Sequence, residues 1–204
     1  LVGAQGAVVG VDPAPAMRAM TERRVEGAAN AEVLDGGATA IPLDDDSVDR
    51  ALSVQVLEYV ADVEAALAEL HRVLRPGGRL VIWDVDWSTL SWHAEDADRA
   101  ARVLAAWDGH VAHPALPRRL GGLLRAGGFA DVGCAGHAFT TIDADLQTYG
   151  GLAAPMVAQW LETVEDPALA QDGRGWVEEQ RRLGEQGAYF FSVTQCCFTA
   201  TRPA

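Results

Sequence analysis

Lysine is absent from this 204-residue chain, and its 16 strongly basic residues are all arginines. There are 29 acidic residues, so the formal net charge at pH 7 is −13. Nucleic acids and anionic membranes both bind proteins through basic surfaces. The charge therefore argues against a nucleic acid or a membrane as the partner and favours a small molecule.

Cysteine is scarce, and long apolar runs are missing. The sequence contains no run of 18 apolar residues, so it predicts no transmembrane helix. Its three cysteines, Cys134, Cys196 and Cys197, lack the spacing of metal ligands. Because they fall in strand-like runs, we expect reduced core residues, as in a cytoplasmic protein. His110 and His113 have no third ligand near them, and we expect no metal site.

The remaining composition, 49% hydrophobic and 22% charged, is that of a globular domain. Strands and helices alternate through the first two-thirds of the chain, which predicts a doubly wound α/β fold with a mostly parallel sheet. The apolar run 48–56 is typical of a strand that is covered on both faces. The expected strands are 8–12, 31–35, 48–56 and 79–86, and the expected helices are 15–24, 60–74, 94–108 and 116–126.

The last third has a different pattern. Residues 130–141 and 189–201 are strand-like, and two helical patterns, 146–164 and 175–183, lie between them. We expect an antiparallel strand pair at a sheet edge and a helical lid over the ligand end at 146–186. A single domain would then span residues 1–204. Its parts would be a cofactor-binding core at 1–86, helices at 87–128, and the strand pair with its lid at 129–204.

The segment 6–12 predicts a buried strand that ends on a carboxylate and turns at once into a helix. In open α/β sheets, an acid at this strand end accepts hydrogen bonds from the ribose hydroxyls of an adenosine-containing cofactor. Asp12 is therefore the first candidate for a ligand contact. The alternative is that Asp12 only caps the helix that follows.

The start of the chain is short for such a unit. A strand and a glycine-rich loop normally precede the strand that carries the acid, but only about six residues do so here. We expect an N-terminally incomplete form of the natural protein, with a strand and Gly-x-Gly within roughly 30 residues before Leu1. The alternative is that Gly3 and Gly6 form the phosphate loop, but no strand precedes them and no helix follows.

Four motifs then occur in order: GVDPAPAM at 10–17, ATAIPLDDDSVD at 38–49, VLEYV at 56–60 and LRPGGRL at 74–80. Together they resemble the class I S-adenosylmethionine-dependent methyltransferases, in particular the ubiquinone/menaquinone and sterol C-methyltransferases. The resemblance is dense over 7–86 and weaker over 187–201. It implies a Rossmann-like sheet with an antiparallel last strand and S-adenosylmethionine across the strand ends. The activity that it implies is methyl transfer, here to a small, partly apolar metabolite.

The resemblance also implies which residues bind the cofactor. Asp12 would bind the ribose hydroxyls, and Met17 would pack on one face of the adenine. Ser53 and Gln55, at the end of the central strand, would line the methionine part. The alternative for Met17 is an ordinary core residue.

The adenine ring would lie against a second turn. Here Ala38 would donate its backbone N–H to the ring, with Thr39 beside it. Family members usually carry an acid just before that alanine, where this chain has Gly37. Asp35, the nearest acid, is one candidate to replace this acid in the contact with adenine, and a backbone or water contact is the other.

Candidate residues for the chemistry follow the strand at 79–86. His93 is a candidate general base because its reference pKa is near neutral, and Asp86 is a candidate to orient a polar acceptor. A surface or capping role for His93 and a turn-capping role for Asp86 are the alternatives. Trp87 would form a wall of the substrate pocket or else belong to the core. Tyr59, Tyr149 and Trp160 are further candidates for the substrate mouth and the lid.

Two other functions remain possible from the sequence. A nicotinamide-dependent oxidoreductase would also use an acid at the end of its second strand. However, the short-chain class of these enzymes needs a Tyr-x-x-x-Lys pair, and this chain has no lysine. The second alternative is a non-catalytic cofactor-binding domain.

Overall fold

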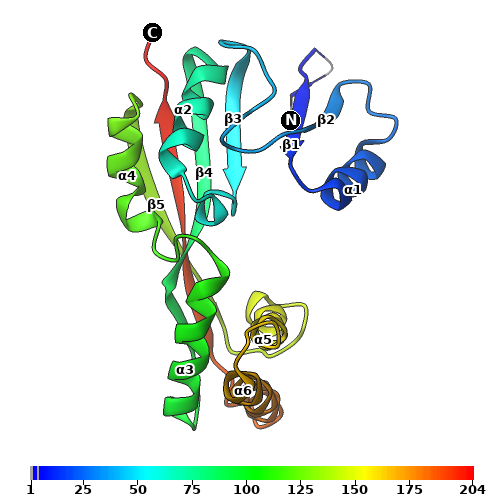
Figure 1. Ribbon diagram of the computed structural model, residues 1–204, viewed down its shortest axis with the longest axis vertical. Coiled ribbons are helices and arrows are strands. Elements are labelled where there is room, and N and C mark those ends of the chain that lie inside the picture. The colour runs from blue at the N-terminus through cyan, green and yellow to red at the C-terminus, as the bar shows by residue number, and fades with distance from the viewer. Residues whose placement is uncertain (1, 4) are drawn as a thin grey trace.

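The computed structural model describes residues 2–3 and 5–204. Its strands form two groups (Figure 1). β1 (Val8–Asp12) and β2 (Ala31–Asp35) form a parallel pair, with α1 (Pro15–Val25) between them in the chain. The larger sheet has the order β3–β4–β6–β5. Its strands are β3 (Val48–Val54), β4 (Leu74–Trp92), β5 (Ala130–Thr141) and β6 (Phe191–Thr201).

The antiparallel last strand is confirmed. β3 and β4 run parallel, whereas β6 runs antiparallel to both of its neighbours, β4 and β5. The fold is thus a Rossmann-like α/β fold with a mixed sheet. The expected antiparallel pair at a sheet edge is also found, because β5 is an edge strand and β6 lies next to it.

β4 is much longer than the strand expected at 79–86. It has 19 residues and continues past the end of β3, paired with β6 and with an irregular register between Asp86 and Ser91. The sheet therefore has a lower half that β3 does not reach. Figure 1 shows this half beside α3 (Ala97–Trp107), α5 (Tyr149–Leu161) and α6 (Pro167–Glu185).

Each half of the sheet has its own hydrophobic core. In the upper half, α2 (Val63–Val73) and α4 (Pro117–Ala126) pack against the sheet through residues such as Leu67, Leu80 and Leu120. In the lower half, aromatic residues dominate, among them Trp92, Trp176 and Phe191. The two short 3-10 helices are η1 (Leu57–Tyr59) and η2 (Asp108–His110).

Capping residues set helix starts that differ from the expected ones. α2 begins at Val63 rather than at residue 60, because the Asp62 carboxylate accepts a hydrogen bond from the Ala65 N–H at 2.9 Å. α6 begins at Pro167 rather than at residue 175, with Asp166 as its cap. The expected lid at 146–186 is therefore helical, and it consists of α5 and α6.

The expectation of core cysteines is wrong for Cys134, which is exposed, while Cys196 and Cys197 are half-buried. The reason is that β5 is an edge strand with little covering either face. Over residues 2–3 and 5–204, no helix is both long and apolar enough to cross a bilayer. Within the same residues, no three potential metal ligands lie together.

Candidate cofactor and substrate site

Asp12 lies at the carboxyl end of β1, beside Asp35 at the corresponding end of β2. Its Oδ1 accepts a hydrogen bond from the Ala14 N–H at 2.7 Å, which closes a turn immediately after the strand. The N-cap of α1 is Ala14, and no side chain caps that helix. Asp12 thus does not act as the helix cap. Among the described residues no hydrogen bond uses its Oδ2, so this oxygen suits a ribose hydroxyl.

Arg18 joins the two strand ends. Its Nη1 donates to the Asp12 carbonyl at 2.9 Å and forms an ion pair with Asp35 Oδ1, also at 2.9 Å. Asp35, the acid considered for the adenine, is therefore paired with an arginine. Met17, on the same helix, is 47% exposed, which does not fit the alternative of an ordinary core residue.

The turn that follows β2 contains Gly37, Ala38 and Thr39. The Ala40 N–H donates to the Gly37 carbonyl at 3.0 Å, so the backbone reverses over the two residues between them. Ala38 is half-buried against the upper core, and Thr39 is exposed. The structure thus presents a tight turn near the end of β1, as the proposed contact with adenine requires.

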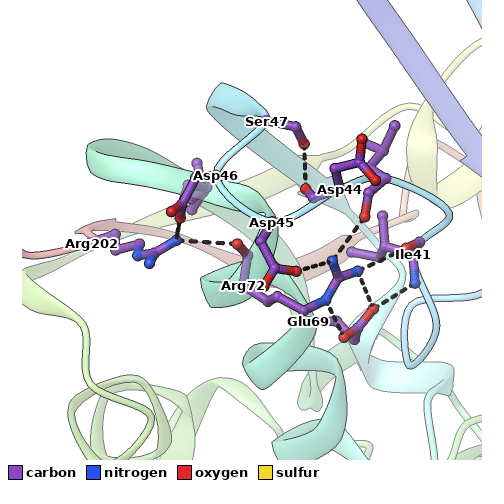
Figure 2. Close-up of polar contacts among 10 residues, drawn as sticks. Ile41, Asp44, Asp45, Asp46, Ser47, Glu69, Arg72 and Arg202 are labelled. Atoms are coloured by element: carbon purple, nitrogen blue, oxygen red, sulfur yellow. Dashed lines mark hydrogen bonds and ion pairs between the residues drawn. The ribbon is translucent and has the colours of Figure 1, made fainter.

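Figure 2 shows how the loop after this turn is fixed. The Arg72 guanidinium donates to the carbonyls of Ile41 and Leu43 at 2.9 and 2.8 Å and forms ion pairs with Glu69 and Asp45. The Glu69 carboxylate also accepts the Ile41 N–H at 2.8 Å. Hydrogen bonding to Arg72 lowers the pKa of Glu69. The acidic turn 44–46 is thus held against α2, and so is Ile41, which directly follows the turn 37–40.

Ser53 and Gln55 lie at the end of β3. Ser53 is 8% exposed, and its hydroxyl has no hydrogen-bond partner. Gln55 has a φ of 51°, which is unusual for a residue other than glycine, and its N–H donates to the Trp83 carbonyl at 2.7 Å. Strained backbone of this kind is often found at ligand sites.

Two carboxylates that the sequence analysis missed lie at the same strand ends. Glu58 of η1 and Asp84 of β4 are both fully buried. Burial raises the pKa of Glu58, and burial together with the Glu58 charge raises the pKa of Asp84 to about 7. A sequence signal existed, because Asp84 interrupts the apolar run at 80–85.

α5 contributes Tyr149 to this group. Tyr149 is the first residue of α5, and its hydroxyl lies near Gln55, Glu58 and Gln195. Burial raises the pKa of Tyr149, and burial raises that of the half-exposed Tyr59 to about 12. Both phenols are therefore neutral donors at ordinary pH. The structure thus brings together two of the predicted substrate residues with Gln55.

His93 does not join them. It is exposed, and it follows the far end of β4, whereas Trp83 of β4 lies beside the end of β3. At about 3.3 Å per residue, His93 is on the order of 30 Å farther along the strand. This distance contradicts the prediction of a general base at the cofactor.

Asp86 and the two tryptophans have partners within the protein. Asp86 accepts from Arg118 Nε at 2.9 Å and from Ser88, which fits the alternative of a turn-capping residue. Trp87 is 7% exposed and packs edge-on against Trp107, which fits its core alternative. Trp160 of α5 also packs edge-on against Trp107.

A shallow depression of about 520 Å³ lies elsewhere, where α3 begins beside α6. Its lining is largely ion-paired, because Arg99 contacts Glu179 and Arg182 contacts Glu95. It is lined by the start of α3 and by α6 and contains none of the predicted site residues.

Comparison with known proteins gives a consistent result. Residues 1–82 match the family described as a methyltransferase domain. An uncharacterized 37.1 kDa protein from a transposon of Streptomyces fradiae is 38% identical over 130 residues, which are 63% of this chain and 38% of that protein. The demethylmenaquinone methyltransferase of Thermus thermophilus is 46% identical over 77 residues, which are 37% of this chain and 34% of that enzyme.

Among solved structures, the YcgJ protein of Bacillus subtilis superposes with a TM-score of 0.63 at 17% identity. The match covers 97% of this chain and 83% of that one, so the likeness concerns the fold. The chain spans less than two-fifths of the length of these curated relatives.

Proposed function

We propose that the protein is a class I S-adenosylmethionine-dependent methyltransferase that transfers a methyl group to a small, partly apolar metabolite. The observation that carries this proposal is the family match over residues 1–82. These residues build β1, β2, β3 and the first part of β4, whose carboxyl ends hold the candidate site. The cofactor would supply an electrophilic methyl group on a sulfonium centre.

Four features of the chain would bind this cofactor. Asp12 would accept hydrogen bonds from the ribose, and the turn 37–40 would contact the adenine. Met17 would cover one face of the ring, and Ser53 with Gln55 would line the methionine part. The free Oδ2 of Asp12 and the exposure of Met17 support these assignments.

The acceptor would bind between the end of β3 and the lid. Val54, Val56 and Tyr59 are exposed at the end of β3, and Leu152 and Met156 are exposed on α5. In Figure 1 the β3 arrow points toward the half of the molecule that contains α5. Apolar residues on both sides support a partly apolar acceptor, because burying them against it is favourable.

The work of the protein would be alignment rather than acid–base chemistry. A methyl transfer is an in-line displacement, so the protein accelerates it mainly by holding the acceptor in line and excluding water. Tyr149, at the start of the lid, and Tyr59 would orient a polar group of the acceptor with their neutral hydroxyls. The net charge of −13 supports a small molecule rather than a nucleic acid, and the three free cysteines support a cytoplasmic location.

Calorimetric titration with S-adenosylhomocysteine and, separately, with NAD tests the cofactor assignment. We expect binding of S-adenosylhomocysteine and none of NAD. Tight NAD binding without S-adenosylhomocysteine binding would reverse the proposal in favour of an oxidoreductase.

Transfer of labelled methyl groups to a panel of acceptors tests the substrate class. The panel would contain small phenols and hydroquinones, small amines, a peptide mixture and transfer RNA. Labelling confined to the peptides or to the RNA would contradict the assignment of a small, partly apolar acceptor.

A further inference from the structure

The buried acids Glu58 and Asp84 differ from the other carboxylates of the site. Glu58 Oε2 accepts the Val85 N–H at 3.0 Å, and Asp84 Oδ1 accepts the Val56 N–H at 3.2 Å. The second oxygen of each, Glu58 Oε1 and Asp84 Oδ2, has no hydrogen-bond partner. Each acid thus holds the backbone of the element that carries the other. The second oxygen of each makes no further hydrogen bond, although the Trp87 indole N–H lies near Glu58 and lowers its pKa.

Ser53 adds an independent observation at the same place. Its hydroxyl is more than nine-tenths buried and also lacks a partner. Ser53 is the residue of β3 that pairs with Ile82, two positions before Asp84 on the same face of β4. Ser53 and Asp84 therefore place two unpartnered oxygen atoms on one face of β3 and β4, and η1, which carries the third on Glu58, follows β3 directly.

No cation of the described residues forms an ion pair with either acid. Two adjacent buried carboxylates without a counter-ion are costly, so the pair must either bind a proton or face a cation. The pKa values of both acids are raised, chiefly by burial. With a pKa of about 7, Asp84 is poised to change its charge near neutral pH, beside a Glu58 whose pKa is also raised.

The other titratable groups around the pair remain neutral near pH 7. Partial desolvation raises the pKa values of Tyr59 of η1 and Tyr149 of α5. Cys196, the β6 residue paired with Asp84, has a thiol pKa of about 11, raised by burial and then by Cys134. Burial lowers the pKa of His110, which packs against Tyr59. Asp86, the next acid on the same face, is neutralised by an ion pair with an arginine of α4.

We propose that Glu58 and Asp84 together form the counter-charge for the sulfonium of the methyl donor, sharing a proton in the free protein and releasing it when the cation binds beside turn 55–59. The proposal rests on the proposed function, because it assumes the donor. Neither acid is exposed, so the pair acts on the cation through space rather than by contact. At an effective dielectric constant of about 20, a carboxylate separated from the sulfonium by a single layer of side chains would change the affinity for the donor by roughly ten- to a hundredfold.

The donor and its product provide a matched pair of ligands. S-adenosylmethionine carries the sulfonium charge, and S-adenosylhomocysteine has a neutral thioether at the same position. Product would bind without displacing the shared proton, so the pair would also favour release of the product relative to the donor at neutral pH. This discrimination would grow with pH, as the carboxylates ionise.

The test is calorimetry of both ligands near pH 6.5 in buffers of different ionisation enthalpy, with affinities measured from about pH 5.5 to 8. We expect proton release with S-adenosylmethionine but not with S-adenosylhomocysteine. Over this range the donor's affinity should rise roughly ten- to a hundredfold more than the product's. In Asp84→Asn, and separately in Glu58→Gln, this difference should shrink to near zero.

Each other result has a definite meaning. Equal proton release with the two ligands, or a difference that persists in both variants, would overturn the counter-charge. Equal weakening of both ligands in the variants would show a structural role only and would also overturn it. If neither ligand binds the wild-type protein, the proposed function fails and this proposal fails with it. Thermal unfolding shows whether Asp84→Asn and Glu58→Gln are folded. If one of them does not fold, the other still tests the proposal.

Discussion

Replacing Asp84 with asparagine should make the protein more stable, and the gain should grow with pH. In the folded protein the pKa of Asp84 is raised from its ordinary value of 3.8 to about 7. Between these two values the unfolded chain has lost the proton that the folded chain still holds. Stability therefore falls as the pH rises through this window, and it levels off above pH 7.

The size of this loss follows from the two pKa values. At 1.36 kcal/mol per unit, the carboxylate costs about 4 kcal/mol of stability above pH 7. Roughly 2–3 kcal/mol of this is lost between about pH 5 and pH 8, which corresponds to roughly 5–10 °C in Tm. The asparagine side chain of Asp84→Asn would keep an oxygen that can accept the Val56 N–H, and it would not titrate. Any cost of its unpaired amide would not depend on pH.

Thermal unfolding followed by circular dichroism at pH 5 and pH 8 measures this effect. The difference in Tm between Asp84→Asn and the wild type should widen by the stated amount at the higher pH. Asp49→Asn is the control, because the Asp49 side chain is 70% exposed and should change Tm little at either pH. If Asp84→Asn and the wild type differ in Tm by the same amount at pH 5 and pH 8, Asp84 does not ionise against a burial cost.

Two further predictions concern the scaffold. Leu120→Ala removes a fully buried side chain from the upper core and should lower the free energy of unfolding by about 2–5 kcal/mol, measured by chemical denaturation. The exposed Leu152→Ala is the control and should lower it by about 0.5 kcal/mol or less. Similar losses in the two variants would contradict the core assignment. Arg72→Met should speed amide hydrogen exchange across 41–46 and weaken S-adenosylhomocysteine binding, since it releases the loop that directly follows turn 37–40. Arg125→Met is its control, because the exposed Arg125 guanidinium donates to the Gly121 carbonyl of its own helix, and equal exchange in the two variants would show that Arg72 does not hold the loop.

Local patterns were enough to predict most elements. β1, β2 and β5 begin and end where expected, because each is a compact strand-like run next to residues that favour turns. α6 was predicted too short, since Gly173 and Gly175 have low helix propensity. Tertiary packing explains Gly173, where a Cβ would come within 2.9 Å of the Leu161 side chain. The continuation of β4 beyond Asp86 depends on pairing with β6, which is distant in sequence.

The site could be predicted only where a motif marks it. Asp12 and the turn 37–40 were found because their positions relative to strands follow a known pattern. Glu58 and Asp84 were missed because their significance comes from burial and from their nearness to each other, whereas the order of residues showed only that Asp84 interrupts an apolar run. His93 was misplaced for the opposite reason, since nearness in sequence to the strand end did not mean nearness in space.

The most direct measurement is the affinity of S-adenosylhomocysteine for Asp12→Ala, determined by calorimetry beside the wild type and the exposed control Glu32→Ala. Loss of hydrogen bonds from two ribose hydroxyls to a carboxylate should weaken binding roughly 10- to 100-fold in Asp12→Ala and leave Glu32→Ala unchanged. An unchanged dissociation constant in Asp12→Ala would contradict the placement of the cofactor at the end of β1.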